Sequence, residues 1–240
     1  MRWKKHHIEI KESVITVLCD PAFIEAGKKG ILQVRKEIED FISDHAEFES
    51  SHSPLNPPPG SAPVIKKMYT ESKKAGVGPL AAVAGTVAAQ CLEEVMKAGA
   101  PEAVVDNGGD IALFIRQPLK VGIYAGENFP LNLGFEVEPR TRPLGICTSS
   151  GTVGHSFSYG KADAAVVISE NIILADAAAT ALANRVLSED DLNSCFDFLT
   201  SLPEIEGSLV IWQDKISLWG TLPPLVKCKD ASKLITRGRG

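Results

Sequence analysis

The sequence predicts an α+β fold in which antiparallel sheets are backed by helices. Two observations lead to this prediction. Short segments rich in β-branched residues occur in pairs, and each pair is joined by turn residues. Helical segments stand between these pairs instead of alternating with single strands, as they would in a parallel α/β sheet. With 240 residues, the chain is long enough for one large domain with a substantial core.

The first half begins with a strand pair and continues with helices. Residues 8–10 and 13–19 are expected to form a hairpin. Residues 31–48 predict an amphipathic helix, because apolar side chains recur at spacings of three and four. The repeated prolines of residues 50–63 exclude helix and sheet, so this segment is expected to be a surface loop. Further helices are predicted over 64–74 and 79–98, and strands over 102–105 and 111–115.

The second half is predicted to repeat this plan. Strands are expected over 120–125 and 131–137, followed by an inserted segment, 140–169, that contains two more apolar strands. An alanine-rich helix is predicted over 172–187, a helix capped by Ser188 and Asp191 over 188–199, and a closing hairpin over 208–212 and 216–219. We therefore expect a single domain, 1–240, with pseudo-repeats over 1–117 and 118–223, and a C-terminal tail over 224–240.

The bulk composition excludes several classes of protein. The net charge of −5 gives no general electrostatic case for nucleic-acid binding. Five scattered cysteines without a Cys-x-x-Cys pair predict reduced thiols and no structural zinc. No apolar run approaches the roughly 18 residues that a membrane-spanning helix needs. The sequence thus predicts a cytoplasmic protein that binds neither membranes nor nucleic acid.

The first polar cluster lies between the strands predicted at 102–105 and 111–115. It reads Asp106-Asn107-Gly108-Gly109-Asp110. Paired glycines allow positive φ and close approach of the backbone, which suits a hairpin turn and also a ligand site. The turn is the simpler interpretation; in the alternative, Asn107 and Asp110 present polar groups to a ligand.

The second cluster is the loop from Cys147 to Asp163, rich in hydroxyls and glycines. Such a stretch offers many donors to a phosphate or pyrophosphate, and Lys161 and His155 add positive charge. The alternative is a long polar loop without a function. The loop lacks the Walker A and dinucleotide-binding patterns. Its candidate ligand-binding residues are Thr148, Ser149, Ser150, Gly151, Thr152, His155, Ser156 and Lys161.

The third cluster lies on the alanine-rich helix, where Asp176, Thr180 and Asn184 recur every four residues and share one stripe. A buried carboxylate is costly unless something pairs with it. Asp176 and Thr180 provide hard oxygen ligands of the kind that Mg²⁺ accepts. The simpler alternative is an aspartate near a helix start, with Thr180 bonded back to the Asp176 carbonyl.

Two nucleophile hypotheses are also open. Cys147 with His155 would form a thiolate pair, and Ser149 or Ser150 would be acylated. The apolar strand before Cys147 favours a buried structural thiol instead. The Gly-x-Ser-x-Gly motif of serine hydrolases is absent.

These motifs together resemble a known family. Asp106-Asn-Gly-Gly-Asp110, Thr148-Ser-Ser-Gly151 and Ala175-Asp176-Ala-Ala-Ala-Thr180 occur in the order and approximate spacing seen in ApbE-type FAD:protein FMN transferases. The chain is still more similar to an uncharacterised bacterial and archaeal branch of that superfamily. The resemblance to this branch covers most of the chain and includes Gly76-Val-Gly-Pro-Leu-Ala-Ala-Val-Ala-Gly85.

The resemblance implies a duplicated T-fold-like domain that binds FAD and Mg²⁺ and forms a homo-oligomer. It implies that Asp176 and Thr180 hold the metal, with a backbone carbonyl near residues 81–84, and that residues 107–110 line the flavin pocket. The family's Lys-Gly-x-x-x-Asp pattern is absent from residues 80–86, and its His-x-x-Asp-Pro segment is missing near His155.

Three functions follow as hypotheses. The first is Mg²⁺-dependent phosphoryl or pyrophosphoryl chemistry on a flavin or other nucleotide-like ligand, as a transferase or an FAD-cleaving hydrolase. In it, His155 or Asp163 acts as the general acid or base. The second is a non-catalytic module that binds the same ligand. The third is a cysteine- or serine-dependent enzyme.

Overall fold

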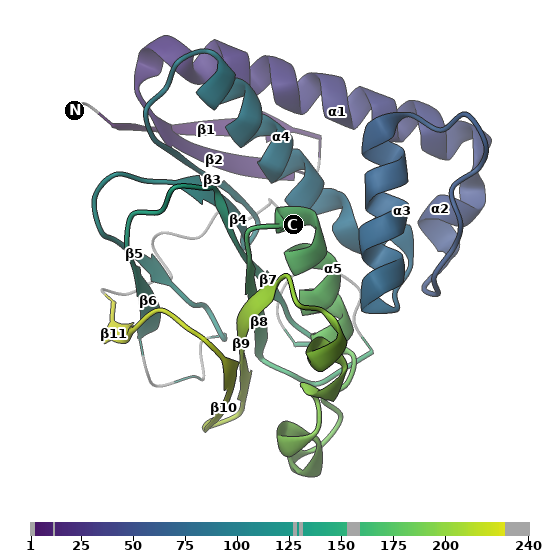
Figure 1. Ribbon diagram of the computed structural model, residues 1–240, viewed down its shortest axis with the longest axis vertical. Coiled ribbons are helices and arrows are strands. Elements are labelled where there is room, and N and C mark those ends of the chain that lie inside the picture. The colour runs from purple at the N-terminus through teal and green to yellow at the C-terminus, as the bar shows by residue number, and fades with distance from the viewer. Residues whose placement is uncertain (1–2, 12, 127–128, 130–131, 153–158, 229–240) are drawn as a thin grey trace.

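A computed structural model describes residues 3–11, 13–126, 129, 132–152 and 159–228 (Figure 1). It has three layers: a layer of helices, a large antiparallel sheet of eight strands, and a small antiparallel sheet of three strands. The helices cover one face of the large sheet and the small sheet covers the other (Figure 1). This confirms the predicted fold class of antiparallel sheets backed by helices.

The first half contains four strands of the large sheet and most of the helical layer. Its elements are β1 (Lys4–Ile10), β2 (Ser13–Cys19), the 3₁₀ turn η1 (Pro21–Phe23), α1 (Ile24–Asp44), α2 (Ala46–Ser50), α3 (Pro63–Ala75), the 3₁₀ turn η2 (Pro79–Ala82), α4 (Val83–Lys97), β3 (Ala103–Asn107) and β4 (Asp110–Phe114).

The second half contains the small sheet and the other four strands of the large sheet. Its elements are β5 (Leu119–Gly122), β6 (Leu133–Val137), β7 (Leu144–Ser149), β8 (Ala164–Ser169), α5 (Ile172–Ala183), the 3₁₀ segments η3 (Glu189–Asn193) and η4 (Asp197–Ser201), β9 (Ile205–Trp212), β10 (Lys215–Gly220) and β11 (Leu225–Lys227). The expected C-terminal tail thus begins with a strand, which pairs with β6.

The strand order corrects one part of the predicted plan. The large sheet runs β1-β2-β3-β4-β7-β8-β9-β10, so each half supplies a strand pair, helices and a second strand pair. The strands predicted over 120–125 and 131–137 do not open the second half of this sheet. They correspond to β5 and β6, which form the small sheet with β11. β7 and β8 are the first strand pair of the second half in the large sheet.

The large sheet has a hydrophobic core on each of its faces, and this explains why β7 and β8, and not β5 and β6, belong to it. Every residue of β8 is buried, because one of its faces packs under α5 and the other faces the small sheet. A strand covered on both faces reads as a continuous apolar run. β5 has one buried residue in four, as expected for a strand in an outer sheet.

Two predicted helices also differ from the structure. The amphipathic helix begins at Ile24, earlier than expected, and α1 ends at Asp44 before the short helix α2. Residues 188–199 do not form one helix. The capping box of Ser188 and Asp191 is present, but it starts the 3₁₀ segment η3, and Ser194 ends that segment. Asn193 and Ser194 are weak helix formers, because their side chains compete for backbone hydrogen bonds.

The loop over 50–63 is held against the helices. The backbone N–H of Gly78 donates to the His52 carbonyl at 3.1 Å, and the Lys73 ammonium donates to Asn56 Oδ1 at 2.8 Å. A side chain at Gly78 would overlap the Ser51 carbonyl, since a Cβ there would lie 1.8 Å from that oxygen. The loop is therefore fixed beside the turn that precedes α4.

Within the described ranges, no single helix is long and apolar enough to cross a membrane. α3 and the segment Pro79–Lys97 meet the length and composition test only as a pair, and they are bent by 106° relative to each other.

α4 and α5 lie in close contact at Gly85, which gives a test of the packing. A Cβ on Gly85 would lie 2.7 Å from Asp176 Cβ and 3.0 Å from the Ile172 carbonyl oxygen. Helix propensity alone makes Gly→Ala stabilising by up to about 1 kcal/mol. We expect Gly85→Ala instead to lower the free energy of unfolding by about 1–3 kcal/mol, because the helices must separate. Urea denaturation measures the sign, and a stabilised variant would contradict this packing.

Candidate functional site

The first polar cluster forms the hairpin turn between β3 and β4. Asn107 pairs with Asp110 across the strands, and Gly108 and Gly109 make the turn with φ of 68° and 106°. Such positive φ values are what a two-residue hairpin turn requires. Asp106 Oδ1 accepts a hydrogen bond from the Gly109 N–H at 3.0 Å. The turn thus places Asn107 and Asp110 opposite each other, as the residue pair nearest the turn.

Asn107 connects this turn to the start of α4. Its side chain is buried, and its Nδ2 donates to the Ala84 carbonyl oxygen at 3.0 Å. Gly109 faces β7, because a Cβ there would lie 3.7 Å from the Thr148 carbonyl oxygen. The turn is therefore enclosed between α4 and β7.

Asp176, on α5, also contacts the start of α4. Its buried carboxylate accepts the Gly85 N–H at 2.7 Å and also interacts with the Ala84 N–H. These amides belong to the first turn of α4, where backbone N–H groups have no partner within the helix. Burial raises the pKa of Asp176 to about 7, although these two amides act in the opposite direction.

Asp110 is a second buried carboxylate beside Asp176. Burial and then the charge of Asp176 raise the pKa of Asp110 well above its usual value, while contacts with the Cys147 thiol and the Thr148 N–H oppose the shift. Among the described residues, Asp110 Oδ1 has no hydrogen-bond partner. Two adjacent carboxylates, one with an unpaired oxygen, favour a proton or a cation between them.

Thr180 follows Asp176 by one helical turn and is partly buried. Residues 148–151 lead from β7 into the polar loop. Ser149 is buried at the end of β7, and Ser150 and Gly151 are held against the other side of the loop, since the Gly151 N–H donates to the Ala162 carbonyl at 2.9 Å. Thr148 adjoins Gly109 and so belongs with the Asp110 group.

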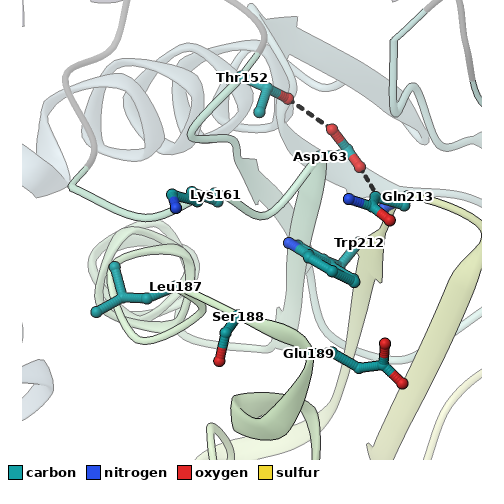
Figure 2. A pocket seen from close by; sticks show the side chains of 8 residues that line it. All are labelled: Thr152, Lys161, Asp163, Leu187, Ser188, Glu189, Trp212 and Gln213. Atoms are coloured by element: carbon teal, nitrogen blue, oxygen red, sulfur yellow. Dashed lines mark hydrogen bonds between the residues drawn. The ribbon is translucent and has the colours of Figure 1, made fainter.

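Thr152, Lys161 and Asp163 lie elsewhere, in a cavity of about 490 Å³ (Figure 2). Asp163 joins its walls: Thr152 Oγ1 donates to Oδ1 at 2.8 Å, and the Gln213 N–H donates to Oδ2 at 2.5 Å. The structure therefore divides the predicted site residues into two groups. Asn107, Asp110 and Asp176 meet beside the start of α4, and Thr152, Lys161 and Asp163 meet beyond the end of α5. His155 and Ser156 lie outside the described residues.

Several contributors were absent from the sequence prediction. The two α4 amides that bind Asp176 belong to Ala84 and Gly85, whose side chains give no sign of it. Asn184 lay on the predicted stripe without a role; its Oδ1 accepts the Tyr159 N–H at 2.9 Å and so fixes one end of the polar loop to α5. The signal in the sequence was a polar side chain at the end of an otherwise apolar helix, because a polar group there needs a hydrogen-bond partner.

A metal would have few protein ligands at this position. Within the part of the chain that the structure describes, no group of three or more His, Cys, Asp or Glu side chains is arranged to hold a metal ion. The donors at hand are the carboxylates of Asp110 and Asp176 and the hydroxyl of Thr180. Mg²⁺ commonly takes one or two carboxylates and fills its other positions with water and substrate phosphate, so this donor set fits Mg²⁺.

Solved structures of similar fold include flavin transferases. A variant of Flavin Transferase ApbE from Vibrio cholerae aligns with a TM-score of 0.61 at 11% identity, covering 92% of this chain and 98% of that chain. The apo form of the Pseudomonas stutzeri flavinyl transferase ApbE aligns with a TM-score of 0.58 at 13% identity, covering 99% and 98%. At this identity the likeness concerns the fold.

Curated relatives are much closer in sequence. A UPF0280 protein of Methanocella arvoryzae is 46% identical over 230 residues, covering 96% of this chain and 94% of the relative. A UPF0280 protein of Archaeoglobus fulgidus is 41% identical over 240 residues, covering 98% and 100%. The family model described as AbpE bacteria matches residues 2–193. The chain therefore belongs to this ApbE-like family, which the motifs around Asn107, Thr148 and Asp176 had indicated.

Proposed function

We propose that this protein binds a flavin nucleotide together with Mg²⁺ and acts on its phosphoryl or pyrophosphoryl group, as a transferase or an FAD-cleaving hydrolase. The observation that supports the proposal is the pair of buried carboxylates, Asp110 and Asp176, beside the first turn of α4. The Vibrio cholerae and Pseudomonas stutzeri proteins of similar fold are flavin transferases by name.

The carboxylate pair supports a cation more than a structural role. Burying a charge is costly unless a partner offsets it, and two adjacent carboxylates repel each other as well. The amides of Ala84 and Gly85 satisfy part of Asp176, but Asp110 keeps one unpaired oxygen among the described residues. A divalent cation held by Asp176 and Thr180, with Asp110 close by, would offset both charges.

Mg²⁺ at this position would neutralise charge on a phosphate that it contacts. Side chains of the protein would bind and orient the ligand. Asp176 is oriented by the Gly85 and Ala84 amides, and Asn107 is oriented by its bond to the Ala84 carbonyl. In the proposal, these groups hold the phosphate end of the ligand, and the ligand-binding residues are Asn107, Gly108, Gly109, Asp110, Thr148, Ser149, Ser150, Gly151, Thr152, His155, Ser156 and Lys161.

The acid–base group of the reaction is His155 or Asp163 in this proposal. Both oxygens of Asp163 already accept hydrogen bonds, one from the Thr152 hydroxyl and one from the Gln213 N–H. This arrangement favours His155 for proton transfer, because both oxygens of Asp163 are already engaged in hydrogen bonds within the protein.

A non-catalytic binding module is the second candidate. It is favoured by the absence of the Lys-Gly-x-x-x-Asp pattern from residues 80–86. The cysteine hypothesis receives no support from geometry. Cys147 is fully buried, and burial and the neighbouring charges of Asp110 and Asp176 raise the pKa of its thiol well above the usual value. A buried thiol that stays protonated is a poor nucleophile.

The metal assignment is tested with Asp176→Asn, which keeps the side-chain shape and removes the charge. We expect the Mg²⁺-dependent part of FAD binding to weaken at least tenfold in isothermal titration calorimetry, because the variant loses an anionic ligand. Asp44→Asn is the matched control, since Asp44 is exposed on α1. Equal Mg²⁺ dependence in both variants would contradict the assignment.

The reaction itself is tested by incubating the protein with FAD and Mg²⁺ and separating the nucleotides by chromatography. Cleavage at the pyrophosphate should release AMP, and FMN should appear free or attached to protein. EDTA should suppress both products. Tight FAD binding without any AMP would favour the binding module.

The carboxylate pair should also make stability depend on pH when divalent cations are removed. The pKa of Asp176, about 7, and that of Asp110 lie above their usual values. The folded state therefore binds more protons than the unfolded chain, and stability falls as pH rises from about 4, the ordinary aspartate value, to about 7, by up to about 1.4 kcal/mol per unit for each proton. Urea denaturation in EDTA should show this decline. Asp110→Asn should flatten it, and an unchanged slope in that variant would exclude the pair as its source.

A further inference from the structure

The large sheet ends in two edge strands, β1 and β10, and β1 is the longer of the two (Figure 1). β1 pairs along its full length with β2 on one side. It is the last strand of the sheet that the structure describes, so the N–H and C=O groups on its other side point away from the sheet. Backbone groups of this kind are available for pairing with a strand of another chain.

The side chains of β1 alternate between two faces. Ile8 and Ile10 pack into the core beneath the helices. The residues between and before them therefore face the other way, and Lys5, His7 and Glu9 are all exposed there. Among the described residues, neither Lys5 nor Glu9 has an ion-pair partner. This face of β1 thus carries one free cation and one free anion, at equal distances from His7.

This spacing matches the geometry of a two-fold axis. An axis through His7, perpendicular to the sheet, pairs β1 antiparallel with β1 of a second copy and keeps each side chain on its own face. Lys5 of each copy then lies opposite Glu9 of the other, where opposite charges attract. This register pairs all seven residues of β1, and any other two-fold register pairs fewer. The register with the longest pairing is therefore also the one that matches both charges.

α1 provides a second contact surface beside this edge. Arg35 donates to Ser13 Oγ and Glu39 pairs with Lys11, so one side of α1 contacts the β1–β2 hairpin. Leu32 precedes Arg35 by three residues and Glu39 by seven, which places it on the same side. α4 packs on a different side of α1 and covers β3 and β4. Leu32, 56% exposed, therefore lies on the flank of α1 that is turned toward the β1 edge.

The other edge strand, β10, is less suited to pairing with a second copy. Its sequence, Lys-Ile-Ser-Leu-Trp-Gly, contains no acidic residue, so two copies would match no opposite charges there. Its lysine, Lys215, is already paired with Glu189 of η3. Ser217 of the same strand donates to the Leu192 carbonyl, so η3 already lies against β10. The charge pattern thus distinguishes β1 from β10.

We propose that two copies of this protein form a symmetric dimer through β1, with Lys5 of each copy opposite Glu9 of the other. The two large sheets then join into one continuous sheet, and both helical layers lie on the same side of it. Lysine on an edge strand usually prevents pairing between edges. In this register, the charge of Lys5 is matched by Glu9 of the second copy. The dimer does not depend on the proposed function.

Charge reversal tests the interface, with sedimentation equilibrium as the measurement. The wild-type chain should be a dimer. Lys5→Glu and Glu9→Lys each place like charges opposite one another twice, so each should raise the dimer dissociation constant at least about tenfold. The double variant, Lys5→Glu with Glu9→Lys, restores both pairs and should return to near the wild-type value. Lys67→Glu is the matched control, because Lys67 is exposed on α3.

Cysteine cross-linking tests the register. His7→Cys places two thiols opposite each other on the axis, within reach of a disulfide, and oxidised glutathione should link the dimer covalently. Lys5→Cys should not link, because the two thiols would be four residues apart along the strands, about 13 Å at 3.3 Å per residue. Non-reducing electrophoresis separates the products, and the wild-type chain controls for its own five cysteines.

Three results would overturn the dimer. The first is a wild-type chain that stays monomeric at every concentration, which would leave the β1 edge to a different partner or to none. The second is a double variant that dissociates as readily as the single charge reversals, since a folded chain with both pairs restored should dimerise. The third is cross-linking of Lys5→Cys as efficient as that of His7→Cys, which would exclude an axis through His7.

Discussion

The arrangement of the site depends on one contact, in which the buried carboxylate of Asp176 accepts backbone hydrogen bonds at the start of α4. The contact requires glycine at position 85, because any larger residue would overlap Asp176 and the Ile172 carbonyl. It also requires small residues along α5, which is buried against β7, β8, α3 and α4 at once. The composition of α5 thus follows from its position, and Asp176 is the polar exception that this position has to accommodate.

The rest of the carboxylate site is arranged around this contact. Ala84 interacts with Asp176 through its N–H, and its carbonyl accepts the Asn107 amide, so one residue of α4 orients both polar groups. The glycine turn then brings Asp110 beside Asp176, where burial and repulsion raise the pKa of Asp110. Each of these groups is bonded to the backbone of another element. The positions of Asn107, Asp110 and Asp176 are therefore set by the packing of the helices and strands.

Much of this could be predicted from the sequence, and the failures have a common cause. Periodicity identified α3, an alanine-rich composition identified α5 except that the helix ends at Ala183 and not at 187, and paired glycines identified the β3–β4 turn, because these signals are local. The partners of a strand are not local. β5 and β6 look as suitable as β7 and β8 for the large sheet, and only burial on both faces of β8 distinguishes them. In the same way, Asp110 and Asp176 could be named as site residues, but not the Ala84 and Gly85 amides that orient Asp176, because every residue has an amide.

The stripe on α5 relates the carboxylate pair to the cavity beyond the end of the helix. Asp176 and Asn184 are eight residues apart, which is about 12 Å along a helix at 1.5 Å per residue. Asp176 belongs to the carboxylate pair. Asn184 accepts a hydrogen bond from the N–H of Tyr159, which precedes Lys161, a residue that lines the cavity. One rigid helix thus carries the carboxylate of the proposed metal site near one end and fixes the polar loop at the other. The separation of the two groups of predicted site residues therefore follows from the length of α5.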